Sequence, residues 1–237
     1  MRARLRSKRP SAMWRSLMST ILPVLIAATA ARADDMRFLA LGDSYTVGEG
    51  VAVADRWPAQ LTAMLRAHGV AIGDPQIVAH TGWTTDELAA AMDTAALHPP
   101  YALVTLLIGV NNQFRGRDLE NYRAELQALL ERAIVLAGKQ PQRVIVLSIP
   151  DWGVTRFGHG SGRDQAGIAH EIDAYNAANV EIAKMLHVRY VDVTAVSRDG
   201  GDHADMLVAD GLHPSAAMYR RWAELALPQA QAALATR

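Results

Sequence analysis

Short apolar runs alternate with longer stretches of helical periodicity along most of this chain, and this alternation is the feature that most limits its fold. The apolar run over residues 101–108 is bounded by Pro99-Pro100 and Gly109, which is typical of a strand buried on both faces. Over residues 119–136, apolar side chains recur at spacings of three and four, which places them on one helix face that ends at Gly138.

The same pattern along the rest of the chain predicts a layered α/β domain. We expect strands over residues 36–41, 76–79, 101–108, 143–149 and 188–193. We expect helices over residues 57–68, 84–92, 119–136 and 168–186, and a last helix with Pro214 in its first turn. Because strands that alternate with helices require right-handed crossovers, the prediction is a three-layer α/β/α, doubly wound fold with a mostly parallel five-stranded sheet. Its functional crevice should lie beyond the carboxyl ends of the strands.

The first 33 residues have the pattern of a secretory signal peptide. They hold seven Arg or Lys and no acidic residue, and an apolar run over residues 17–31 leads to Ala31-Arg32-Ala33. An uncleaved membrane anchor is the alternative, but the run contains Pro23 and is shorter than the roughly 20 residues that span a bilayer. We therefore expect residues 1–33 to be removed on export to the periplasm or the medium. Residues 34–237 should then form one soluble domain without a stable membrane anchor.

Removal of this segment would leave an acidic domain. The whole chain has a formal net charge of zero, with 24 basic and 24 acidic side chains. Without the seven basic residues of the N-terminal segment, 17 basic side chains face 24 acidic ones, a net charge of −7. Nucleic-acid binding requires a basic surface, so we expect no nucleic-acid partner. The absence of cysteine excludes thiol catalysis and cysteine-bound metals.

Polar, glycine-containing turns follow the first three expected strands. They read GDSYT at residues 42–46, TGWTT at 81–85 and GVNN at 109–112, and a further segment, DGLHP at 210–214, precedes the last helix. Taken singly, a serine after a strand is more often a helix cap than a nucleophile, and the other residues have equally ordinary roles in turns. Together they include what ester hydrolysis needs, because a serine hydroxyl becomes a nucleophile when an imidazole, oriented by a carboxylate, takes its proton.

In this order the four segments resemble the SGNH hydrolase superfamily of GDSL-like lipases and esterases, over essentially the whole chain after residue 40. The resemblance implies a flavodoxin-like fold and a catalytic triad of Ser44, Asp210 and His213. It also implies an oxyanion hole made by the backbone N–H groups of Ser44 and Gly82 and the side-chain amide of Asn111. No metal ion or organic cofactor is expected.

Two residues depart from the family pattern. Asn112 stands where the family often has aspartate, and Arg156 stands where members with an Asp-Trp-Gly segment often have proline. Both departures bear on loop geometry and substrate preference. Trp83, Trp152 and Phe157 are candidate substrate-binding residues.

The expected activity is hydrolysis of carboxylic esters through an acyl-enzyme, with short-chain acyl or acetyl esters preferred and small-molecule, glycan or lipid esters as substrates. The low aromatic content, 6%, argues against a deep tunnel for long lipid chains. Because a fold does not fix a function, three alternatives remain: a lysophospholipase or thioesterase with the same chemistry, an O-acyltransferase, and a non-catalytic periplasmic binding module. The glycine-rich residues 151–167 have two interpretations, a mobile wall of the substrate cleft or an ordinary surface loop. The oligomeric state is not given by the sequence.

Overall fold

The computed structural model describes residues 36–201 and 203–235, and the expected signal peptide, residues 1–33, lies outside them. Within these residues, five parallel strands form one sheet in the order β2-β1-β3-β4-β5. The strands are β1 (Phe38–Gly42), β2 (Pro75–Ala79), β3 (Leu103–Leu107), β4 (Val144–Leu147) and β5 (Arg189–Val191). The predicted five-stranded parallel sheet is confirmed.

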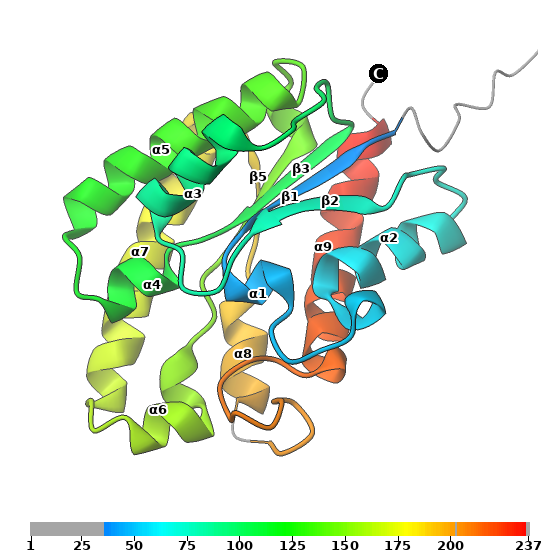
Figure 1. Cartoon of the computed structure of the whole chain (residues 1–237). Helices are drawn as coiled ribbons and strands as arrows, with labels where there is room; N and C mark the ends of the chain where they lie inside the picture. The colour runs from blue at the N-terminus through cyan, green and yellow to red at the C-terminus, as the bar shows by residue number, and fades with distance from the viewer. Residues whose placement is uncertain (1–35, 202, 236–237) are drawn as a thin grey trace, which may run out of the picture. The chain divides into compact units, whose positions relative to one another are not determined.

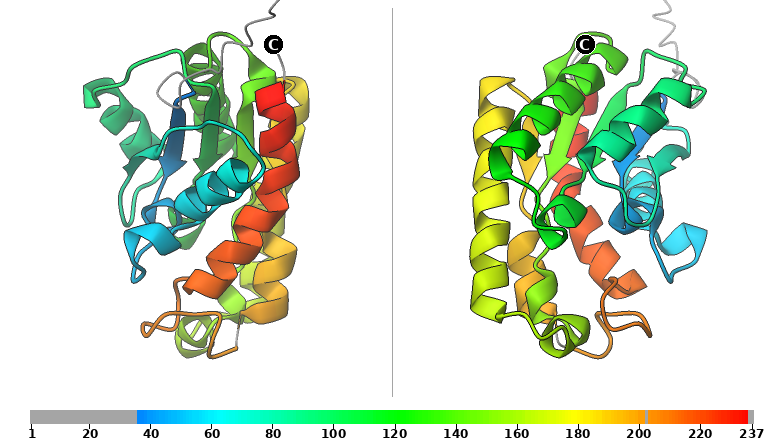
Figure 2. Two further views of the ribbon diagram at one scale, coloured as in Figure 1. Left: turned by 90° about the vertical axis from the view of Figure 1, so that its right-hand side faces the viewer. Right: turned by 60° about the vertical axis from the view of Figure 1, so that its left-hand side comes forward.

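Helices cover both faces of this sheet. The helices α2 and α9 pack together on one face, and α3, α5 and α7 cover the other (Figures 1 and 2). No helix within the described residues is both long enough and apolar enough to cross a membrane. The helices are α1 (Ser44–Val47), α2 (Trp57–Ala67), α3 (Thr85–Thr94), α4 (Val110–Phe114), α5 (Leu119–Leu136), α6 (Arg156–Gly160), α7 (Gln165–Met185), α8 (Thr194–Gly200) and α9 (Ala216–Ala235), with single 3₁₀ turns at η2 (Val53–Asp55), η3 (Pro141–Arg143) and η4 (Trp152–Val154).

The three central strands are almost entirely apolar because both of their faces are covered, and Thr105 in β3 is their one polar side chain. Every residue of β1, β3 and β4 is buried, whereas β2, at the edge of the sheet, is mostly half-buried. Gly42 at the end of β1 is in register with Ala79 of β2 and with Leu107 of β3. The turns that follow these three strands therefore leave the sheet side by side. In this strand order, the chain reverses direction of winding between β1 and β3, which is where ligands bind in such folds.

The last helix begins later than the sequence predicts. Pro214 forms an isolated antiparallel bridge with Leu207, and α9 starts at Ala216. Ser215 precedes the helix, and its hydroxyl accepts a hydrogen bond from the backbone N–H of Met218. The prediction that Pro214 occupies the first turn is wrong, because the bridge holds this residue extended. The bridge instead closes the loop that carries Asp210 and His213.

Candidate active site

Ser44 is the first residue of α1, directly beyond β1. The preceding Asp43 is the N-cap of the helix, and its Oδ1 accepts a hydrogen bond of 3.0 Å from the backbone N–H of Tyr45. Gly42 is required before this turn, because a Cβ there would lie 2.3 Å from the hydroxyl oxygen of Thr46. Strand, glycine turn and cap together hold Ser44 at the carboxyl edge of the sheet.

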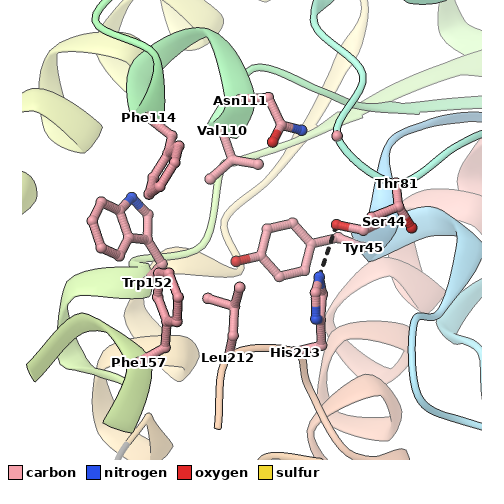
Figure 3. A pocket seen from close by; sticks show the side chains of 11 residues that line it. Ser44, Tyr45, Thr81, Val110, Asn111, Phe114, Trp152, Phe157, Leu212 and His213 are labelled. Carbon is pink, nitrogen blue, oxygen red and sulfur yellow. Dashed lines mark hydrogen bonds between the residues drawn. The ribbon is translucent and has the colours of Figure 1, made fainter. Parts of the chain in front are cut away.

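A chain of hydrogen bonds joins Ser44, His213 and Asp210, and Figure 3 shows the bond between Ser44 and His213. The distance from His213 Nε2 to Ser44 Oγ is 2.9 Å, and that from His213 Nδ1 to Asp210 Oδ2 is 2.6 Å. A carboxylate can only accept, so Nδ1–H donates to Asp210 and Nε2 is left to accept the proton of the serine hydroxyl. The imidazole thus has the tautomer that a base acting on Ser44 requires.

The loop between the β-bridge partners fixes the carboxylate. Partial burial raises the pKa of Asp210, but hydrogen bonds from the His213 ring and from the backbone N–H groups of Leu212 and His213 outweigh burial, so the net pKa lies below its usual value. These two backbone bonds, 2.8 and 3.0 Å long, both end on Oδ1. Asp210 is therefore charged at neutral pH and its second oxygen is free to orient the imidazole.

The three groups expected to donate to the oxyanion, on Ser44, Gly82 and Asn111, all line the pocket that also contains His213. The backbone N–H of Ser44 opens α1 and so has no acceptor within that helix. Gly82, in the turn after β2, has a φ of +87°, which glycine adopts without strain. Asn111 lies in α4, and its Nδ2 donates one hydrogen bond of 2.9 Å to the carbonyl of Trp83, which leaves the second amide hydrogen available.

Arg115 anchors the glycine turn and was not singled out by the sequence. Its Nη2 donates a hydrogen bond of 2.6 Å to the carbonyl of Gly82, and its Nη1 lies 3.4 Å from Glu87 of α3. Glu87 in turn accepts a hydrogen bond from the backbone N–H of Thr84 in the capping box of α3. The turn that carries Gly82 is therefore fixed by side-chain hydrogen bonds at the carbonyl of Gly82 and at the backbone N–H of Thr84.

The pocket has a volume of about 220 Å³ and an aromatic wall. Phe114 lies edge to face with Trp152, with ring centroids 5.2 Å apart, and the centroid of Phe157 is 6.0 Å from that of Trp152. Trp152 is held by a hydrogen bond of 2.8 Å from its Nε1 to Gln113. The lining is Ser44, Tyr45, Thr81, Gly82, Val110, Asn111, Phe114, Trp152, Phe157, Leu212 and His213 (Figure 3).

Two of the three candidate substrate-binding residues, Trp152 and Phe157, belong to this lining, and Trp83 does not. Trp83 instead stacks on His80, with ring centroids 5.4 Å apart and an interplanar angle of 28°. Residues 151–167, for which a mobile wall and a surface loop were both considered, fold into η4, α6 and the start of α7. Through Trp152 and Phe157, this segment forms one side of the pocket.

The two departures from the family pattern lie outside the pocket lining. Asn112 is buried, and its amide exchanges hydrogen bonds of 3.1 and 2.6 Å with the backbone N–H and hydroxyl of Thr85. Arg156 is the first residue of α6, a position that proline also favours. Its side chain lies against Gly211, where a Cβ would be 3.1 Å from the Arg156 Cβ. Asn112 thus joins α4 to α3, and Arg156 packs against the loop of Asp210 and His213.

Comparison with known proteins gives the same family as the motifs. The model of the GDSL-like Lipase/Acylhydrolase family matches residues 40–221. The structure of TesA is 21% identical, with a TM-score of 0.65 over 84% of this chain and 100% of TesA. The psychrotrophic esterase EstA from Pseudoalteromonas sp. is 16% identical, with a TM-score of 0.63 over 83% of this chain and 97% of EstA. The acetylxylan esterase Axe2 from Geobacillus stearothermophilus is 20% identical, with a TM-score of 0.62 over 82% of this chain and 94% of Axe2.

No curated protein matches the sequence significantly. At these identities the solved structures show the shared fold, while the family match rests on the sequence itself and spans the segments of Ser44, Gly82, Asn111 and His213. This chain belongs to the GDSL-like lipase/acylhydrolase family and is a carboxylic ester hydrolase.

Proposed function

We propose that the protein hydrolyses short-chain acyl or acetyl esters, with Ser44 as nucleophile, His213 as general base and Asp210 as the carboxylate that orients it. The observation that carries the proposal is the continuous pair of hydrogen bonds from Ser44 Oγ through the His213 ring to Asp210, 2.9 and 2.6 Å long, at the edge of an apolar pocket. Nucleophile and base within hydrogen-bond reach, with the base oriented by a third group, is the arrangement that activates a serine.

In the first half of the reaction, Ser44 Oγ attacks the ester carbonyl carbon while Nε2 of His213 takes the hydroxyl proton. The carbonyl oxygen becomes negatively charged, and the N–H groups of Ser44 and Gly82 and the amide of Asn111 donate to it. His213 then gives the proton to the oxygen of the leaving alcohol, and an acyl-Ser44 ester remains. In the second half, water attacks this ester with His213 again as base, and the acid and Ser44 are released.

The size and lining of the pocket support a short acyl group. Its volume of about 220 Å³ is below the roughly 300–1,000 Å³ of pockets that hold drug-sized ligands. Phe114, Trp152 and Phe157 stand opposite Ser44 in the pocket (Figure 3). The similarity to Axe2, an acetylxylan esterase, adds weight to acetyl or other short acyl groups on a carbohydrate.

The test is a chain-length series of p-nitrophenyl esters from acetate to palmitate. We expect the purified protein to show its highest kcat/KM on acetate to butyrate, and Ser44→Ala to lose about 10⁴-fold or more in kcat. Ser161→Ala, which changes a serine outside the pocket lining, is the matched control and should retain activity. Hydrolysis of none of these esters would contradict the proposal, and an optimum at palmitate would favour a lipase-like enzyme.

We also propose that the protein is exported. The support is the sequence of residues 1–33, with its basic start, apolar run and Ala-Arg-Ala ending. Expression of the full chain in a Gram-negative host should yield a periplasmic or secreted protein whose mass corresponds to an N-terminus at Asp34. An intact N-terminus on a cytoplasmic product would contradict this.

A further inference from the structure

Tyr45 is a further polar residue of the pocket, next to the proposed nucleophile Ser44. Its ring lies between Val110 and Leu212 in Figure 3, and its hydroxyl points toward the side formed by Trp152. The residue is only 3% exposed. Its backbone N–H is bonded to Asp43, but no hydrogen bond joins its hydroxyl to any residue in the ranges 36–201 and 203–235.

The hydroxyl of Tyr45 is not among the fully buried polar atoms without a partner, so it retains surface that a ligand or water in the pocket can reach. Tyrosine hydroxyl groups inside a protein are otherwise usually hydrogen-bonded to another residue. Three other tyrosines of this protein follow that rule: the hydroxyl groups of Tyr101, Tyr122 and Tyr175 donate to Gln76, Asn179 and the carbonyl of Arg117. The hydroxyl of Tyr45 differs from these three, because it opens into the pocket beside Val110, Leu212 and Trp152 and no described residue bonds to it. The hydroxyl is therefore explained best by a partner that arrives with the substrate.

We infer that the hydroxyl of Tyr45 donates a hydrogen bond to the substrate, and that this pocket takes esters with a hydroxyl or carbonyl oxygen close to the scissile ester bond. The inference rests on the proposed hydrolysis at Ser44. Burial raises the pKa of Tyr45 above its usual range, and the charges of Asp43, Asp151 and Asp210 act in the same direction. The phenol is thus protonated throughout the working pH range and is a donor.

The oxygen has two sources, the acyl group or the alcohol, and paired substrates separate them. For the acyl group, p-nitrophenyl 3-hydroxybutyrate is compared with p-nitrophenyl 3-methylbutyrate. For the alcohol, 3-hydroxypropyl acetate is compared with butyl acetate. Each pair exchanges a hydroxyl for a methyl group of similar size, so the ratio of kcat/KM within a pair measures recognition of the oxygen. Differences in intrinsic reactivity cancel when the ratio of a variant is divided by that of the wild type.

Tyr45→Phe is the test variant and Tyr219→Phe the matched control. The hydroxyl of Tyr219 likewise lacks a partner in the described residues, but it is fully buried and lies on α9 outside the pocket lining. We expect Tyr45→Phe to lower the hydroxyl-to-methyl ratio by roughly 3- to 10-fold in one of the two pairs, the value of a single neutral hydrogen bond. Tyr219→Phe should leave both ratios at the wild-type value.

Two results would overturn the inference. Tyr45 also borders a small cavity of about 20 Å³ beside Asp151 and Ser197, a volume that holds one water molecule. If the hydroxyl served only that cavity, Tyr45→Phe would shift the thermal midpoint and leave both ratios unchanged. If wild type hydrolysed none of the four esters, the proposed esterase function would fail and the inference with it. Hydrolysis with unchanged ratios rejects the inference alone.

Discussion

Asp43, the residue before the proposed nucleophile Ser44, gives the most quantitative prediction. The residue is 0% exposed, and Oδ2 of its carboxyl group has no hydrogen-bond partner among the described residues. Burial raises the pKa of Asp43 from 3.8 to about 7, although the backbone N–H groups of Tyr45 and of Asp43 itself act to lower it. The substitution Asp43→Asn retains an oxygen that can cap α1 and removes the titratable charge.

The sign of the effect follows from the raised pKa. A carboxyl group that holds its proton more tightly in the folded protein stabilises the fold fully below the unfolded pKa of 3.8, and this stability is lost as the pH rises through about 7. At 1.36 kcal/mol for each pKa unit, the whole shift corresponds to about 4 kcal/mol. Two of the roughly three pKa units of this shift lie above pH 5. The free energy of unfolding of wild type should therefore fall by about 3 kcal/mol relative to that of Asp43→Asn between pH 5 and pH 9.

The assay is urea unfolding at pH 5, 6, 7, 8 and 9 for wild type, Asp43→Asn and a control variant. Asp118→Asn is the matched control, because Asp118 caps α5 with the same kind of bond, 2.9 Å to the N–H of Asn121, but is exposed. We expect the free energy of unfolding of wild type to fall relative to Asp43→Asn and to run parallel to that of Asp118→Asn. A difference between wild type and Asp43→Asn that does not change with pH would refute the reasoning.

Substitutions at three positions test the rest of the site. Asp210→Asn should lower kcat on p-nitrophenyl acetate by about 10⁴-fold, because the amide no longer selects the tautomer of His213; a loss under tenfold would contradict the triad. Arg115→Ala should lower kcat about 10-fold or more with little change in KM, as expected when one oxyanion donor is displaced. Arg115→Lys should restore little of this activity, because lysine lacks the guanidinium fork. An unchanged kcat would show that Gly82 holds its position without the hydrogen bond from Arg115. Trp152→Ala should lower the free energy of unfolding by about 3–5 kcal/mol in urea, since the ring is 2% exposed, and a loss below 1 kcal/mol would contradict its packing.

The strands could be predicted because their sequences are constrained on both faces. The run before Gly109 is apolar except at Thr105, as expected for a strand between two helical layers, and proline and glycine mark its ends. The predicted strands β3 and β4 were too long, because burial continues past the last strand residue at Ile108 and Ile149. The apolar pattern of the sequence indicates which residues are buried, whereas the end of a strand is set by its last backbone hydrogen bond to a neighbouring strand.

The members of the hydrogen-bonded chain could also be named from the sequence, because the segments that carry Ser44, Asp210 and His213 resemble those of the SGNH hydrolase superfamily. Spacing alone left each of these residues an ordinary role as a cap or turn former. The direction of the Trp83 side chain could not be predicted in the same way. In sequence Trp83 is next to a pocket residue, but the backbone of Gly82 has a φ of +87°, and the carbonyl of Trp83 is bonded to Asn111. The direction of a side chain in such a turn depends on contacts with distant residues, which neither local propensity nor spacing contains.

Arg115 also acts through contacts that are distant in the sequence, so its role could not be predicted from local pattern. The strand β2 is half-buried at the edge of the sheet, so it fixes the turn that follows it only weakly. Two consecutive carbonyls of that turn, those of Gly82 and Trp83, accept hydrogen bonds from Arg115 and Asn111, which are 33 and 28 residues away along the chain. Since β2 and β3 flank β1, these bonds join the two turns on either side of the turn that leads to Ser44. The rigidity of the candidate oxyanion hole therefore comes from α4 and the residue that follows it, not from the strand that carries Gly82.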